Sequence, residues 1–290
     1  MDTGEVLQRL GYKPDAKLCI ISCDYLGFSH SFNLGVFDAM RNGVATCARL
    51  VLNAPWSREV NALYRGEDVG VALALTSDHD IFRMAPLTQS PTLVDGTGEL
   101  PKTLEEFWEH GDTAEVRREC RAQIERAIFY GFDPSHLASE AQALTLRPEF
   151  FDVLLDVALE FGLPLRIPVE HDINHYAFPA ASVAAEEGVI CPNAQVCLFD
   201  SGHTSAEASR EALSVVAAAL EPGVTEISFR PAVASAELEA LMGEEYVRYL
   251  KAYELLTDKH TAEIFADHHI ALVGYRELKK IQAETIGQTT

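Results

Sequence analysis

The stretch LCIISCDYLGFSHSFN, residues 18–33, decides the fold. Its first five residues, 18–22, are mostly apolar on both faces, and a helix is expected to begin near Phe32. A buried strand that leads within a few residues into a helix is typical of a parallel sheet covered by helices. The connection SCDYLGFS, 22–29, lacks the GxGxxG pattern of a dinucleotide-binding open sheet. The stretch therefore favours a closed (β/α) barrel, with a doubly wound open sheet as the second choice.

The same alternation of short apolar runs and longer amphipathic segments repeats along the chain. We expect strands at 18–22, 45–51, 69–75, 136–138, 163–167, 195–199, 225–229 and 270–273. We expect long helices at 113–130, 147–161, 205–220 and 236–256. This order predicts an α/β fold, a TIM-like (β/α)7–8 barrel in which 1–290 form a single domain. One connection, 76–112, is much longer than the others. Such an insertion after the third strand is expected to form a rim or lid over the C-terminal mouth of the barrel.

The composition argues against several kinds of partner. The 290 residues include 23 Lys and Arg against 44 Asp and Glu, which gives a net charge of −21. Nucleic acids and anionic membranes are bound mainly through clustered Lys and Arg, so neither is expected. We see no signal peptide and no apolar run near the ~20 residues of a membrane span, so a cytoplasmic protein is expected. The six cysteines lack zinc-site spacing and are expected to be reduced thiols.

Polar and titratable residues gather where the expected strands end. Asp24, Tyr25 and His30 follow the first strand; Asp78, His79 and Asp80 follow the third; His136 and Glu140 flank the fourth; Glu170, His171, Asp172 and His175 follow the fifth; Asp200 and His203 follow the sixth; Arg230 follows the seventh. In a barrel of parallel strands the C-terminal ends meet at one mouth, where active sites lie. A mouth with so many titratable groups suits general acid–base chemistry.

Several long blocks, in order and over essentially the whole chain, resemble the YdjC family of carbohydrate deacetylases, also called the ChbG/HpnK family. They are SCDYLGFSHSFNLGVFDAMRNGVATCARLVLNAPW at 22–56, VGVALALTSDHDIFRMAPL at 69–87, RPEFFDVLLDVALEFGLPLRIP at 147–168 and TEISFRPA at 225–232. The resemblance implies a barrel of the glycoside hydrolase/deacetylase type and hydrolysis of N-acetyl groups on amino sugars. It also implies one divalent metal ion, such as Mg or Zn, as the family cofactor.

The metal-binding positions depart from the family pattern. The resemblance places the three family ligands on Tyr25, Ala72 and Glu140, and it places a further family His on Arg230 and a family Asp on Ala138. Alanine has no donor atom, tyrosine is a poor ligand for a divalent ion at neutral pH, and arginine repels a cation. We therefore expect neither a metal nor another cofactor. Asp24 and His136 keep family residues.

These considerations give a set of predicted site residues. The catalytic candidates are Asp24, Tyr25 and Glu140, and the substrate-binding candidates are Arg230, His136, His30 and His79. Arg230 suits an anionic substrate group, because its planar fork matches a carboxylate or phosphate.

Each candidate also has a structural interpretation. Asp24 could have a purely structural role, as a strand-end carboxylate that accepts hydrogen bonds from backbone N–H groups. Glu140 could serve to neutralise the charge of Arg230. His136 is more often a structural strand residue than a catalyst, and His30 could cap the helix that follows it. A displaced metal site at 78–80 or at the pair His171 and His175 is the less favoured alternative.

Three functions remain open. The first is a repurposed, metal-independent enzyme acting on a small, anionic, sugar-like substrate. The second is a pseudoenzyme, a sugar-binding or regulatory subunit that pairs with an active relative. The third is a metal-dependent deacetylase with relocated ligands. Under each of the three, we expect a small carbohydrate-like ligand. Each is also compatible with a homo-oligomer or a complex with a relative.

Overall fold

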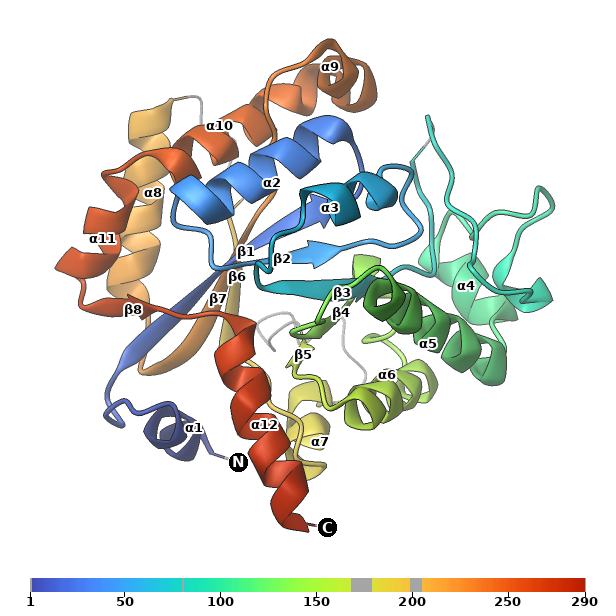
Figure 1. Cartoon of the computed structure of the whole chain (residues 1–290), viewed down its shortest axis with the longest axis horizontal. Helices are drawn as coiled ribbons and strands as arrows, with labels where there is room; N and C mark the ends of the chain where they lie inside the picture. Colours follow the sequence, from blue (N-terminus) through green and yellow to red (C-terminus); the bar gives the residue numbers. More distant parts are fainter. Residues whose placement is uncertain (1, 80, 168–178, 199–204, 290) are drawn as a thin grey trace.

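The fold is built on a sheet of parallel strands wrapped by helices (Figure 1). The computed structural model describes residues 2–79, 81–167, 179–198 and 205–289. The strands are β1 (Lys17–Leu26), β2 (Cys47–Leu50), β3 (Val69–Leu73), β4 (Leu137–Ser139), β5 (Leu165–Arg166), β6 (Ala194–Cys197), β7 (Gly223–Phe229) and β8 (Ile270–Leu272). Among the described residues, no helix combines the length and the apolar character needed to cross a bilayer.

The strand order confirms the predicted TIM-like α/β fold. The sheet runs β5-β4-β3-β2-β1-β7-β6, so β1 to β5 are neighbours in chain order, as in a barrel. Strand β1 is the centre of the sheet. It pairs with β7 on one side, and on its other side it pairs first with β8 and then with β2. Within the described residues, the ladder is open between β5 and β6.

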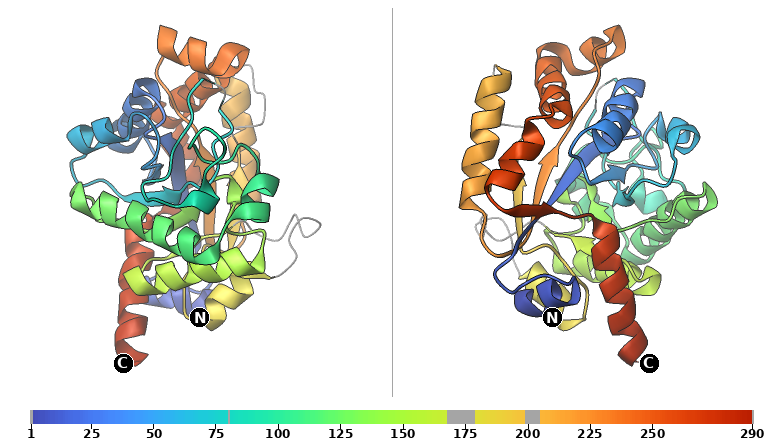
Figure 2. Two further views of the ribbon diagram at one scale, coloured as in Figure 1. Left: turned by 90° about the vertical axis from the view of Figure 1, so that its right-hand side faces the viewer. Right: turned by 60° about the vertical axis from the view of Figure 1, so that its left-hand side comes forward.

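Helices surround this sheet (Figure 1). They are α1 (Thr3–Arg9), α2 (His30–Asn42), α3 (Ser57–Leu63), α4 (Leu104–His110), α5 (Thr113–Phe129), α6 (Pro148–Phe161), α7 (Ala180–Glu186), α8 (Ala206–Ala219), α9 (Ala236–Met242), α10 (Tyr246–Thr257), α11 (Thr261–Asp267) and α12 (Tyr275–Thr289). Figure 2 shows that α1 and α12, and with them both chain termini, lie at the same end of the molecule.

Two boundaries differ from those expected. The helix expected at 236–256 is divided into α9 and α10, because Gly243 takes a positive φ of 55° that ends α9 and a short 3-10 turn follows. Strand β1 continues beyond residue 22 to Leu26. Its register with β2 is irregular between Cys23 and Leu26, where Tyr25 has a φ of 67°. Such a bulge redirects a side chain, which is how Tyr25 leaves the regular alternation of the strand.

The insertion 76–112 is fastened to the outside of the barrel. It contains a short 3-10 turn (Pro91–Leu93) and α4. The carboxylate of Glu119 on α5 is fully buried, and it accepts hydrogen bonds from the backbone N–H groups of Leu87 and Thr88 and from the Thr88 hydroxyl. Amide groups of Asn53 and Gln123 donate to the same carboxylate. A buried carboxylate with several donors holds the middle of the insertion in one position.

Candidate functional site

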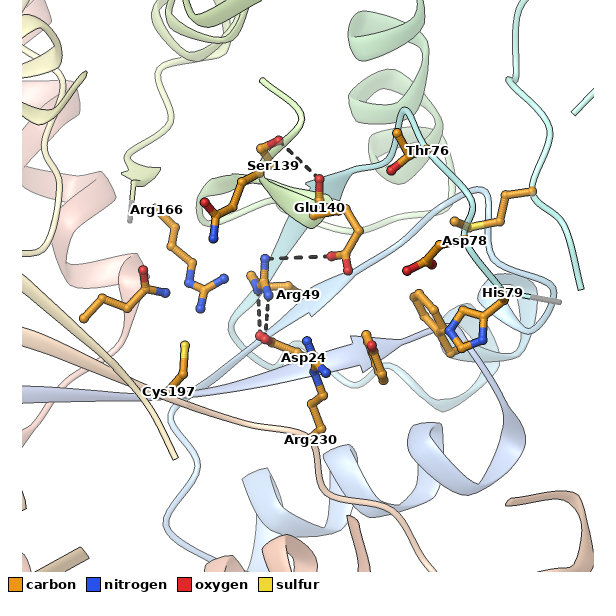
Figure 3. A pocket seen from close by; sticks show the side chains of 16 residues that line it. Asp24, Arg49, Thr76, Asp78, His79, Ser139, Glu140, Arg166, Cys197 and Arg230 are labelled. Atoms are coloured by element: carbon orange, nitrogen blue, oxygen red, sulfur yellow. Dashed lines mark hydrogen bonds and ion pairs between the residues drawn. The ribbon is translucent and has the colours of Figure 1, made fainter. Parts of the chain in front are cut away.

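A pocket of about 220 Å³ opens where β1 to β7 end (Figure 3). It is lined by Asp24, Tyr25, Phe28, Arg49, Thr76, Asp78, His79, Met84, Ser139, Glu140, Ala141, Gln142, Arg166, Gln195, Cys197 and Arg230. The lining comes from the two ends of the sheet as well as from its centre. The volume is small beside the ~300–1,000 Å³ of pockets for drug-sized ligands, so it suits a small molecule.

Asp24 and Arg49 form a buried ion pair in the middle of the pocket. Arg49 donates from Nε to Asp24 Oδ1 at 2.7 Å, and its Nη2 lies 2.6 Å from Oδ2. This fork geometry is the strong form of an arginine–carboxylate pair. Burial raises the pKa of Asp24, but Arg49, Arg166 and Arg230 outweigh it and hold the pKa at about 2. Asp24 is therefore a fixed anion at neutral pH and a weak proton acceptor.

Glu140 lies on the other side of Arg49. Its Oε2 is 4.0 Å from Arg49 Nη1, which is longer than a hydrogen bond, and its side chain is 17% exposed. The next two residues, Ala141 and Gln142, have positive φ values of 47° and 60° and turn the chain sharply after β4. The structure thus places Glu140 against Arg49 on β2, a partner that the sequence interpretation, which weighed Arg230, did not consider.

Arg230 lies against the ring of Tyr25. The guanidinium carbon is 4.2 Å from the centroid of the Tyr25 ring. The ring of Phe28 also stacks on Tyr25, with the two ring centroids 4.3 Å apart. Burial raises the pKa of Tyr25, and the lowering by Arg230 is too small to offset it. The Tyr25 hydroxyl therefore stays protonated at neutral pH, where it can donate a hydrogen bond.

A third arginine, Arg166, forms the wall made by β5. Its Nε is 2.6 Å from Oε1 of Glu226, a fully buried residue of β7. When the amide of Gln195 is turned so that its oxygen faces the guanidinium, that oxygen accepts hydrogen bonds from Arg166. Sequence reasoning missed both Arg49 and Arg166. Each of them is the single charged residue inside a mostly apolar strand segment. This pattern could have identified them, because a buried charge needs a partner inside the barrel.

His79 is in the pocket, as the sequence analysis expects of a substrate-binding residue. It comes from the start of the insertion, together with Thr76 and Asp78 (Figure 3). Its ring stacks on Phe82 at 4.6 Å and meets the edge of Phe28 at 5.5 Å. These aromatic rings give one side of the pocket an apolar surface.

His136 and His30 are not among the residues that line the pocket. His136 is fully buried below the pocket, because it immediately precedes β4 and lies two residues before Ala138. Its ring stacks on Tyr275 at 3.7 Å. His30 begins α2 on the outside, where its Nδ1 is 2.6 Å from Glu59, and the helix is capped by Ser29 instead.

Some of the expected mouth residues lie outside the described residues. They are Asp80, Glu170, His171, Asp172, His175, Asp200 and His203.

The residues that are described do not fit a divalent metal ion. In the parts of the chain that the structure describes, His, Cys, Asp and Glu side chains form no group of three or more that could hold one. Ala72 and Ala138 are paired neighbours on β3 and β4, and Ala138 is in register with Arg166 on β5. Small side chains at this level leave space that the long arginine occupies. The described residues therefore lack the set of about three ligands that a divalent ion needs.

Comparison with known proteins agrees with this architecture. The family described as YdjC-like protein matches residues 18–267. A carbohydrate deacetylase of Thermus thermophilus is 37% identical over 164 residues, 57% of this chain and 58% of that protein. A carbohydrate deacetylase of Geobacillus stearothermophilus is 26% identical over 271 residues, 91% of this chain and 99% of that protein. The match thus spans little more than half of the first relative and nearly all of the second.

A solved structure has the same fold. It is a protein of Enterococcus faecalis V583 put forward as a cellobiose-phosphate cleavage protein, with a TM-score of 0.75 and 25% identity. The two chains align over 91% of this chain and 99% of that one. Because the family match covers most of the chain, this protein belongs to the YdjC-like family.

Proposed function

We propose that this chain is a metal-independent member of its family that binds a small carbohydrate with an anionic group. The observation that carries the proposal is the convergence of Arg49, Arg166 and Arg230, from β2, β5 and the end of β7, on one pocket. Guanidinium groups recognise carboxylates and phosphates with matched geometry. The same three charges oppose a divalent cation.

Arg49 supplies a specific point of attachment. Among the described residues, its Nη1 finds no hydrogen-bond acceptor although Arg49 is buried. A buried N–H group without an acceptor costs roughly 1–3 kcal/mol. An oxygen of a bound ligand at this position removes that cost, so the site is prepared for an acceptor.

The relatives support a sugar as the rest of the ligand. Two of them are named as carbohydrate deacetylases, and the Enterococcus protein is put forward as acting on a sugar phosphate. The rings of Tyr25, Phe28 and His79 offer an apolar surface for a sugar ring. A phosphorylated or carboxylated sugar satisfies both sides of the pocket.

Glu140 is the proposed proton-transfer group. Asp24 is held as an anion by Arg49, and Tyr25 stays protonated, so neither exchanges a proton readily near neutral pH. The Glu140 carboxylate is partly exposed to the pocket and lies beyond hydrogen-bond distance of Arg49. A general acid or base needs this access to the ligand.

Thermal unfolding with and without ligand tests the proposal. Glucose 6-phosphate and glucuronate are expected to raise the melting temperature, neutral glucose is not, and EDTA leaves the effect unchanged. Arg230→Ala is expected to weaken the stabilisation, whereas the surface variant Arg117→Ala, which loses a pair with Asp156, leaves it intact. Stabilisation that requires an added divalent metal, or a stoichiometric metal found by elemental analysis, would overturn the proposal.

A non-catalytic sugar-binding subunit is the second candidate. The fixed state of Asp24 and the two alanines, Ala72 and Ala138, favour it, because three family positions then carry no chemistry. Glu140→Gln distinguishes the two candidates. In an enzyme this substitution lowers turnover of the identified sugar while binding persists, whereas a binding subunit shows no turnover in either form and is expected to associate with another chain.

A further inference from the structure

The C-terminal segment of the chain reaches the interior of the barrel from below the pocket. Strand β8 and helix α12, 270–289, follow the end of the family match at residue 267. Helix α12 begins at Tyr275, whose side chain is fully buried. The end of the molecule that carries α12 also carries α1 (Figure 2).

Tyr275 is connected to the pocket through one carboxylate. Its hydroxyl donates to Oε2 of Glu226 at 2.5 Å, and Oε1 of Glu226 lies 2.6 Å from Nε of Arg166. Tyr275 and Glu226 are fully buried, while the side chain of Arg166 is 12% exposed and lines the pocket. The three residues form a continuous path from α12 to the pocket wall.

Arg166 lies on a strand that has few backbone contacts of its own, so its position depends on side-chain contacts. Strand β5 is at one edge of the sheet and consists of two residues, and within the described residues its other edge has no ladder to β6. Gln195 of β6 is in register with Glu226, so both groups meet Arg166 from one side. An arginine side chain carries about 2 kcal/mol of rotamer entropy, and fixing it in advance leaves less to lose when a ligand binds.

The ring of Tyr275 is itself fixed by close packing. It stacks on His136 with ring planes 15° apart, and Nδ1 of His136 is 2.9 Å from the hydroxyl of Ser135. A Cβ atom at Gly70 would be 2.4 Å from the His136 ring, so the absence of a side chain there makes room for the stack. Burial and the nearby Arg49 and Arg166 lower the pKa of His136 well below its ordinary value, which keeps this ring neutral.

We infer that Tyr275 is a positioning residue that, through Glu226, fixes the guanidinium of Arg166 for contact with an anionic ligand. The affinity of the pocket for anions then depends on a helix that lies beyond the family match. The inference rests on the proposed function, since it takes anion binding as the role of Arg166.

A double-mutant cycle tests the inference, with inorganic phosphate as the probe and calorimetry in phosphate-free buffer as the measurement. Tyr275→Phe keeps the ring and removes the hydroxyl, and we expect it to raise the Kd by about 5- to 10-fold. Arg166→Ala is expected to raise the Kd by at least as much. The double variant is expected to bind like Arg166→Ala alone, because the hydroxyl acts only through the arginine.

Two further variants separate positioning from a general loss of stability. Tyr253→Phe loses a comparable hydrogen bond, from its hydroxyl to Asp38 at 2.6 Å, on the outside of the barrel, and its Kd is expected to stay at the wild-type value. Glu226→Gln breaks the same path one step nearer the pocket and is expected to show the same lack of additivity. It replaces Tyr275→Phe in the cycle if that variant does not fold.

The outcomes distinguish this inference from the function on which it rests. If the wild-type protein binds neither phosphate nor glucose 6-phosphate, both fail. If Arg166→Ala weakens binding while Tyr275→Phe and Glu226→Gln bind like the wild type, the positioning role fails and the anion pocket stands. Effects of Tyr275→Phe and Arg166→Ala that multiply in the double variant would also overturn the inference.

Discussion

The buried pair of Asp24 and Arg49 makes a prediction about stability that can be worked from the structure. The pKa of Asp24 falls from its ordinary value of 3.8 to about 2, which corresponds to roughly 2.4 kcal/mol in favour of the charged form in the folded protein. Asp24→Asn removes this charge and leaves Arg49 without its main partner. Loss of one partner of a buried pair costs about 3–5 kcal/mol. Glu140, 4.0 Å from Arg49, offsets part of the loss, so we expect about 3 kcal/mol.

Urea denaturation of four proteins measures this cost: the wild type, Asp24→Asn, Arg49→Met and the double variant. Each single variant is expected to lower the free energy of unfolding by about 3 kcal/mol, and the double variant to recover part of that loss, because neither charge is then buried alone. Glu140→Gln is the matched control, since the distance from its carboxylate to Arg49, 4.0 Å, is longer than a hydrogen bond. A loss below about 1 kcal/mol in Asp24→Asn, or fully additive losses in the double variant, would refute the reasoning.

The same pair predicts a direction for the pH dependence. Because the folded-state pKa of Asp24 is depressed, its contribution to stability is complete above the ordinary pKa of 3.8 and is lost as the pH falls toward about 2. Asp24→Asn should therefore show a smaller loss of stability than the wild type between about pH 4 and pH 2. An identical acid transition in the two proteins would contradict the depressed pKa.

Three further predictions concern the insertion, the barrel interior and the pocket wall. Glu119→Ala leaves several buried donors without an acceptor, so we expect a loss of at least about 3 kcal/mol in the free energy of unfolding and faster cleavage within 76–112 in limited proteolysis. Protection from cleavage equal to that of the wild type would contradict the role of Glu119 in holding the insertion. Gly70→Ala forces a Cβ against His136 and is expected to cost about 1–3 kcal/mol in thermal unfolding, whereas Gly96→Ala, which meets open space, is expected to cost far less. Cys197 is exposed and lines the pocket, so a thiol reagent should label it rapidly in the native protein and more slowly with bound phosphate; Cys197→Ser should remove this fast phase.

The strands were predictable because burial on both faces leaves short apolar runs in the sequence. Their exact ends were not, as β1 shows. Tyr25 continues the strand through a bulge, and a backbone with positive φ at a tyrosine has no signature in the side chains around it. The single helix expected at 236–256 is wrong for a reason that the sequence does show. Gly243 lies within it, and glycine readily adopts the positive φ that ends α9.

The site was predictable in part. Asp24, Tyr25, Glu140, His79 and Arg230 all line the pocket. His136 lies away from the pocket because it precedes β4, whereas the pocket lies where the strands end.

Arg49 and Arg166 were not predicted, because the candidate site residues were those that follow or flank each strand. Both lie within strands and point into the barrel, where their charges are balanced by Asp24 and Glu226. Asp24 and Arg49 come from neighbouring strands, β1 and β2, whereas Arg166 and Glu226 come from β5 and β7, which are not paired in the sheet, so only the folded barrel brings the second pair together.

Because the pocket carries arginines, it needs no loading step after folding before it can bind a ligand. A metal centre must acquire its ion after synthesis, and its ligands compete with protons for it. Guanidinium groups need no such loading, and they keep their charge throughout the physiological pH range. Arg49, Arg166 and Arg230 are thus in place as soon as the chain has folded. Under the proposed function, the charge that binds the anion is therefore the same in metal-starved and metal-replete surroundings.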